Sequence, residues 1–161
     1  MDGFPHFRIV IAYDQCAAGK RALSLSERMG VQLQPRLRIS SDAWKFEMII
    51  HPSLRELAAD AAGNADMLII AMDSVYELPT AVKAWIEEWA GRERNKPVAL
   101  VALHNLGEEP QNDSSSLRSY LYGIAQRADV AFFWRGENGP IENLEQLMSC
   151  GIRTLQPVGE A

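Results

Sequence analysis

Cysteines, long apolar runs and an excess of basic residues are what this sequence of 161 residues has little of. Its two cysteines, Cys16 and Cys150, lie far apart, and neither belongs to a CxxC pair or has a histidine at metal-ligand spacing. This argues against a disulfide framework and a zinc site, and is typical of a reducing cytoplasm. No apolar run reaches the roughly 18 residues of a membrane span. The net charge of −5 argues against nucleic-acid binding, which needs a dense basic surface.

The sequence does contain enough apolar residues for one sizeable core. Hydrophobic residues make up 47% of it, and the length fits one domain, residues 1–161. The first apolar run follows an acid, Asp2, and ends at another, Asp14. A secretory signal would begin with basic residues, so we interpret this run as a first strand.

Short apolar segments alternate with segments of helical periodicity. The expected strands are Phe7–Tyr13, one within 31–40, Met67–Met72, Val98–Leu103 and Val130–Trp134. The expected helices are 14–30 (ended by Gly30), Pro52–Gly63, Pro79–Gly91, one bearing Leu117 to Ala128, and Ile141–Cys150. Residues 41–50 predict either a short capped helix or an irregular connector. The second strand contains Pro35, which cannot donate a ladder hydrogen bond, so we expect it at an edge.

This alternation indicates a parallel sheet covered by helices on both faces. Right-handed crossovers and one polar edge strand favour the strand order 2-1-3-4-5. The predicted fold class is therefore α/β, a three-layer α/β/α sandwich around a five-stranded parallel sheet.

In such sheets, ligands bind beyond the carboxyl ends of the strands, where the winding reverses. Here that point lies between the first and third strands. The candidate ligand-binding residues are Asp14, Gln15, Asp73, Ser74, Tyr76, His104 and Asn105. The alternative is that Asp14 only caps the next helix and that Asp73 and Ser74 only form a turn. No residue is singled out as catalytic or as a metal ligand.

The segment ADMLIIAMDSVYELPTAVKAWIEEW, followed by KPVALVAL, resembles the flavodoxin-like superfamily, in particular the NADPH-dependent FMN reductases. The resemblance covers residues 65–103. It implies the flavodoxin-like fold, and it would place Tyr76 against a flavin ring, with Pro79 and Lys83 as flanking markers.

The end of the first strand, YDQCAAGKR, lacks the Ser and Thr hydroxyls of a phosphate cradle. Asp14 stands at the mouth of the helix, whereas Lys20 and Arg21 lie about two turns inside it. Two negative groups within about 4 Å in a partly dry site repel by several kcal/mol. We therefore predict no cofactor, with FMN as the alternative.

Two further families are resembled in part. RIVIAYDQCAAGKRALSLSERMG is similar to the opening strand and helix of the universal stress proteins, but MDSVYELP stands where their glycine-rich phosphate loop would be. ATP binding is therefore not expected.

Response-regulator receiver domains share the 2-1-3-4-5 order, and Asp73 resembles their phosphoryl acceptor. Asp14 would be one of their two metal-binding acids, but Tyr13 replaces the other. His104 stands where those domains need Ser or Thr, and Arg135 stands where they need Lys. We therefore do not expect phosphorylation.

A nucleophile pair of Cys16 and His104 is a minor alternative, because the first and fourth strands are not adjacent in this order. The spacing of Trp85 and Trp89 predicts core packing, and Trp44 is interpreted either as core or lid, or as a binding residue.

Tyr120 and Tyr122 cannot both face the core, since residues two apart on a helix point in different directions. An exposed tyrosine there leaves room for a homodimer contact. The sequence thus predicts a non-catalytic, cytoplasmic binding or regulatory module that acts through a protein partner or a small ligand. The alternative is an FMN-dependent NAD(P)H oxidoreductase with an atypical phosphate site.

Overall fold

The computed structural model describes residues 6–33, 38–73, 78–91, 99–104 and 112–136. The elements in chain order are β1 (His6–Tyr13), α1 (Cys16–Leu33), β2 (Arg38–Lys45), α2 (Phe46–Ile50), a 3-10 turn (Pro52–Leu54), α3 (Arg55–Gly63), β3 (Met67–Met72), α4 (Thr80–Ala90), β4 (Ala99–His104), α5 (Asn112–Ala128) and β5 (Ala131–Gly136).

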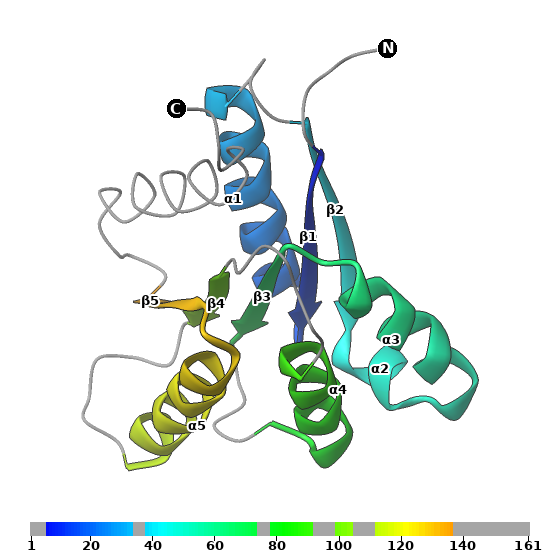
Figure 1. Ribbon diagram of the computed structural model, residues 1–161, viewed down its shortest axis with the longest axis vertical. Helices are drawn as coiled ribbons and strands as arrows, with labels where there is room; N and C mark the ends of the chain where they lie inside the picture. Colours follow the sequence, from blue (N-terminus) through cyan, green and yellow to red (C-terminus); the bar gives the residue numbers. More distant parts are fainter. Residues whose placement is uncertain (1–5, 34–37, 74–77, 92–98, 105–111, 137–161) are drawn as a thin grey trace.

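The five strands form one parallel sheet in the order β2-β1-β3-β4-β5, as the sequence predicted (Figure 1). Tyr13 at the end of β1 pairs with Lys45 of β2 and with Ala71 of β3. Met72 at the end of β3 pairs with His104 of β4. The carboxyl ends of the strands therefore meet at one edge, where a ligand site is expected.

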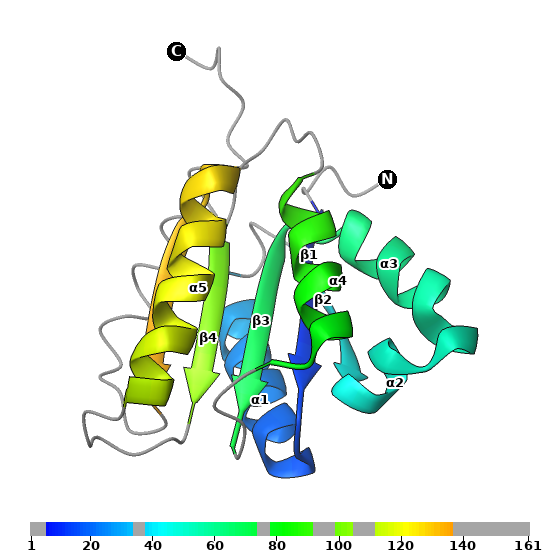
Figure 2. The ribbon, with the colours of Figure 1, turned by 90° about the horizontal axis from the view of Figure 1, so that it is seen from below.

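Helices cover both faces of the sheet. In Figure 2, α4 and α5 lie in front of the strands, α2 and α3 flank them, and α1 lies behind. The side chains of β1 alternate between the two faces: Phe7, Ile9 and Ile11 pack with α1, whereas Val10 and Ala12 pack with the other helices. The core strand β3 is buried along its whole length, as expected for a parallel strand covered on both faces.

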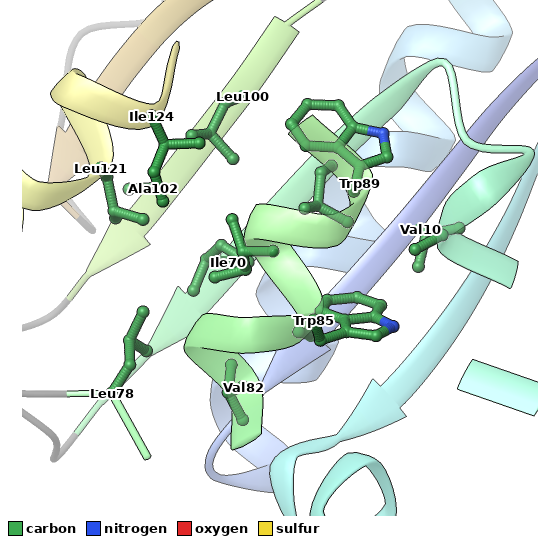
Figure 3. Close-up of a cluster of buried hydrophobic side chains, with 14 of the residues drawn as sticks. Val10, Ile70, Leu78, Val82, Trp85, Trp89, Leu100, Ala102, Leu121 and Ile124 are labelled. Carbon is green, nitrogen blue, oxygen red and sulfur yellow. The ribbon is translucent and has the colours of Figure 1, made fainter. Parts of the chain in front are cut away.

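Helix α4 anchors the larger half of the core, as its spacing predicted. Pro79 precedes it, and Trp85 and Trp89 lie one turn apart on its buried face (Figure 3). The indole N–H of Trp85 donates to the carbonyl of Ala58 in α3 at 2.7 Å. The two helices are therefore joined by a buried hydrogen bond as well as by apolar contact.

Contacts between polar side chains join α4 to α5. The Tyr120 hydroxyl donates to Glu87 at 2.5 Å, and the Lys83 ammonium lies 5.1 Å from the centre of the Tyr120 ring. Burial and the hydrogen bond to Glu87 both raise the Tyr120 pKa. Tyr122 on the same helix is 50% exposed, which confirms that the two tyrosines point in different directions.

The boundary between α1 and β2 was predicted wrongly. Helix α1 does not end at Gly30 but continues to Leu33, because one glycine inside a helix costs only about 1 kcal/mol. The second strand lies at Arg38–Lys45, so the first half of the segment 41–50 is strand, and its second half, Phe46–Ile50, is the expected short helix. Its place at the edge of the sheet is confirmed.

The predicted helix Pro52–Gly63 is a 3-10 turn followed by α3. Ala58 and Ala62 of α3 face the core, whereas Leu57 is 58% exposed. The helix predicted at Ile141–Cys150 lies outside the described residues, as does Pro35. Within the part of the chain that the structure describes, no helix has the length and apolar character to cross a membrane.

Candidate functional site

The ends of β1 and β3 are joined through Asp14. The Asp14 backbone N–H donates to the carbonyl of Ala71 at 3.2 Å. Both oxygens of its carboxylate accept from the backbone N–H of Asp73, at 2.9 and 3.0 Å. The acid that follows β1 is therefore turned toward β3 and engages the first amide beyond that strand.

Arg21 completes a network at this edge. Its guanidinium donates to the carboxylate of Asp73 and forms an ion pair with it. The two side chains are 29% and 17% exposed, respectively. We call Asp14, Asp73 and Arg21 the strand-end network. In this network the Asp14 carboxylate accepts hydrogen bonds from the backbone N–H of Asp73, and the side chain of Asp73 is paired with Arg21.

A cation stands at the strand ends, although the sequence placed Lys20 and Arg21 about two turns inside the helix. Arg21 is five residues beyond Cys16, the first residue of α1, about 7.5 Å along the helix axis. Side chains of an α-helix lean toward its N-terminus, so a long arginine side chain recovers much of that distance. Arg21 therefore reaches the edge although its backbone lies well inside the helix.

The first turn of α1 packs closely on the end of β1. A Cβ atom at Gly19 would lie 3.0 Å from two ring atoms of Tyr13, so this position favours glycine. Gln15 and Cys16, at the start of the helix, are exposed, and the first turn carries no acid. The glycine thus allows close contact between the helix and Tyr13.

A second cluster lies at the carboxyl ends of β4 and β5. The imidazole of His104 stacks on the indole of Trp134, with 4.5 Å between ring centroids and 29° between ring planes. The Arg118 guanidinium of α5 lies 5.9 Å from the centre of the Trp134 ring. Burial lowers the pKa of His104 below its usual 6.5, and the positive charge of Arg118 lowers it further.

The lowered pKa of His104 predicts a loss of stability in acid. The folded state binds a proton at this imidazole less readily than the unfolded chain does, so the stability it contributes is complete above pH 6.5 and is lost as the pH falls. We expect the free energy of unfolding of His104→Phe, which keeps an aromatic ring, to fall less than that of the native chain between about pH 7.5 and about pH 5.5. Urea unfolding at the two pH values measures this, and equal losses would contradict it.

The structure brings together only part of the predicted site. Asp14 and Asp73 meet directly, and Gln15 lies beside them at the start of α1, whereas His104 belongs to the second cluster. The remaining candidates, Ser74, Tyr76 and Asn105, lie outside the described residues. The sequence reasoning missed Arg21, Arg118 and Trp134. For Arg21 the sequence did hold a signal, because it is a long basic side chain on the polar face of α1.

The geometry of the described residues supports neither a nucleophile pair of Cys16 and His104 nor a metal site. The strand order places β3 between β1 and β4, whose ends lead to Cys16 and His104, so the pair is not on adjacent strands. Cys16 is an exposed free cysteine. Among the residues described, no group of three or more His, Cys, Asp and Glu side chains could hold a metal ion.

Solved structures of flavodoxins share this architecture. A short-chain flavodoxin associated with a non-canonical PDU bacterial microcompartment aligns with 95% of this chain and 100% of its own, with a TM-score of 0.63 and 10% identity. The two-electron reduced flavodoxin of Megasphaera elsdenii aligns with 91% of this chain and 99% of its own, with a TM-score of 0.54 and 10% identity. The chain has the flavodoxin-like fold.

No protein-family model matches the sequence, and a search of curated proteins finds no match either. At 10% identity the likeness to flavodoxins concerns the fold alone. Within this flavodoxin-like fold, the strand-end network lies between β1 and β3, where the direction of winding reverses. The chemistry of that position therefore depends on the residues that occupy it.

Proposed function

We propose that this chain is a non-catalytic binding or regulatory module on a flavodoxin-like scaffold, acting through a protein partner or a small ligand. One observation carries the proposal: both carboxylate oxygens of Asp14 accept from the backbone N–H of Asp73. An acid of the chain itself thus uses a donor at the position where a phosphorylated cofactor would enter.

Electrostatics strengthens this argument. A phosphate that approached the same amide would come within about 4 Å of the Asp14 carboxylate, where like charges in a partly dry site repel by several kcal/mol. The cation at the edge does not offset this, because Arg21 is already paired with Asp73. Among the described residues that directly follow β1 and β3 (Asp14, Gln15 and Asp73), none has a hydroxyl side chain, a group that commonly supplies additional donors to a phosphate.

The second cluster offers a different kind of binding surface. His104 and Trp134 present stacked rings that are half-buried, and Arg118 adds an exposed positive charge beside them. Aromatic rings with an adjacent arginine are typical of protein-binding surfaces. We therefore propose this cluster as the contact region for the partner or ligand.

An FMN-dependent NAD(P)H oxidoreductase with an atypical phosphate site is the second candidate. The observation in its favour is the alignment of nearly the whole chain with two flavodoxins. The first turn of α1 has no acid of its own, and Arg21 reaches the same edge. In this reading FMN would have to displace or bypass the carboxylate of Asp14.

Flavin titrations separate the two candidates. FMN and riboflavin, which lacks the phosphate, are added to the purified chain while flavin fluorescence is followed. We expect neither to be quenched at concentrations where flavodoxins are saturated. Saturable quenching by FMN, together with NAD(P)H oxidation by the loaded protein, would support the oxidoreductase and contradict the main proposal.

A matched pair of arginine variants tests the proposed contact region. Arg118 and Arg127 are both exposed on α5, but Arg118 lies beside Trp134. We expect Arg118→Ala to weaken capture of a partner, or stabilisation by a ligand in a thermal-shift screen, and Arg127→Ala to leave both unchanged. Equal effects of the two variants, or no partner and no ligand for the native chain, would contradict the proposal.

A further inference from the structure

Among the described residues, no strand pairs with the outer edge of β2. β2 pairs with β1 on one side and is the last strand of the sheet on the other. In Figure 1 its amino half rises above α2 and α3, which lie near its carboxyl end. Arg38 and Ser40 are exposed along this half, Asp42 is exposed directly after it, and all three share the face of the sheet that carries Val10. An open edge strand is a template for pairing with another strand.

We propose that two copies of this chain pair through β2, antiparallel about a two-fold axis that passes beside Ser40. The five-stranded sheets would join into one sheet of ten strands, with β2 of each copy at the centre. This inference is independent of the proposed function, since the surface lies away from the carboxyl edge.

Symmetry restricts the register. A two-fold axis that makes two edge strands adjacent and antiparallel runs perpendicular to the sheet, so the same face of both sheets points the same way. Directly opposed residues must then lie on the same face of their strands. The two residue numbers of each opposed pair must therefore have an even sum, and one residue lies opposite itself.

Only one such register pairs opposite charges within β2. With Ser40 on the axis, Arg38 of each copy lies opposite Asp42 of the other, which gives two equivalent ion pairs. With Ser41 on the axis, Arg38 would face Trp44. With Asp42 on the axis, two carboxylates would meet. Opposed residues on antiparallel strands lie about 5 Å apart at Cβ, close enough for an ion pair to form.

The contacts of Asp42 and Ser40 are compatible with this register. Asp42 forms no ion pair with another described residue, so its charge is available for a partner copy. Ser40, on the axis, is fixed by a hydrogen bond of 2.9 Å to His6 of β1. Charges on an edge strand commonly prevent pairing because like charges meet. Here Arg38 and Asp42 are four residues apart, so the register centred on Ser40 places unlike charges opposite each other.

Charge reversal tests the pairing. We expect sedimentation velocity to show that the native chain dimerises and that Arg38→Asp weakens the dimer by about tenfold or more, since two like-charge contacts replace two ion pairs. The double variant Arg38→Asp/Asp42→Arg exchanges the partners and should return the dissociation constant to within about threefold of native. Arg55→Asp, which makes the same charge change on exposed α3, is the matched control and should leave the dimer unchanged.

Crosslinking locates the axis independently. In a Cys16→Ala/Cys150→Ala background, Ser40→Cys should be joined to its own copy by a short bis-maleimide, whereas Ser53→Cys, exposed on the 3-10 turn, should not. A native chain that stays monomeric at its highest soluble concentration would overturn the proposal. So would a dimer that Arg38→Asp leaves intact, or a double variant no better than the single one.

Discussion

Replacing Trp89 with alanine is expected to lower the free energy of unfolding by about 3 to 5 kcal/mol, the range for deleting a large aromatic side chain from a core. Trp89 is 0% exposed and lies between α4 and the sheet (Figure 3). Its indole N–H donates to the carbonyl of Ala65 at 3.4 Å, just before β3. The substitution therefore leaves a large cavity and removes a link between α4 and the residues that lead into the central strand.

Urea unfolding followed by circular dichroism measures this loss. Tyr122→Ala is the control, because Tyr122 is 50% exposed and its loss should cost about 1 kcal/mol or less. If the two variants lost similar amounts, Trp89 would not be a main anchor of α4.

Asp14→Ala is expected to lower the free energy of unfolding by about 1 to 3 kcal/mol, because it removes both acceptors of the partly buried Asp73 N–H. Asp14→Asn keeps one oxygen acceptor without the charge and should lose less. The strand-end network acts here as a structural link between β1 and β3, and this is the role that the substitution isolates.

The control for Asp14 is Asp60→Ala, which removes an equal charge from an exposed position on α3 and should change the stability by no more than about 0.5 kcal/mol. Urea unfolding of the three variants ranks them. If Asp14→Ala were as stable as Asp60→Ala, the Asp14 carboxylate would contribute no net bonding at the strand ends.

Much of the architecture could be predicted from the sequence because buried parallel strands leave a strong signal. β3 and β4 were placed to within one residue at each end, since both are continuous apolar runs between polar turns. The position of α4 followed from Pro79, Gly91 and the tryptophan spacing. The order of the strands followed from general rules of handedness together with the polar edge strand.

The boundary between α1 and β2 could not be predicted because neither the end of the helix nor the start of the strand has a clear sequence signal. Gly30 is a common stop signal, yet a single glycine is tolerated within a long helix. β2 is an edge strand whose residues are half-buried or exposed, so its hydrophobic pattern is weak. The alternation of Ser40, Ser41 and Asp42 gives no apolar periodicity to locate it.

The candidate site was predicted in position but not in chemistry. Topology alone placed Asp14 and Asp73 at the same edge. It could not show that the Asp14 carboxylate turns to the Asp73 amide, or that Arg21 reaches Asp73 from the second turn of α1. Those contacts depend on side-chain direction in three dimensions, which spacing along the sequence indicates only for residues of the same helix.

The most direct test is made at the Asp73 amide itself. ¹H–¹⁵N spectra of the labelled native chain are recorded while FMN is added. Because the carboxylate of Asp14 accepts from that N–H, the Asp73 resonance should not shift during the titration. The amide resonance of Cys16, the first residue of α1, should not shift either. A saturable displacement of the Asp73 resonance would mean that an anionic cofactor reaches the strand ends, and would contradict the account.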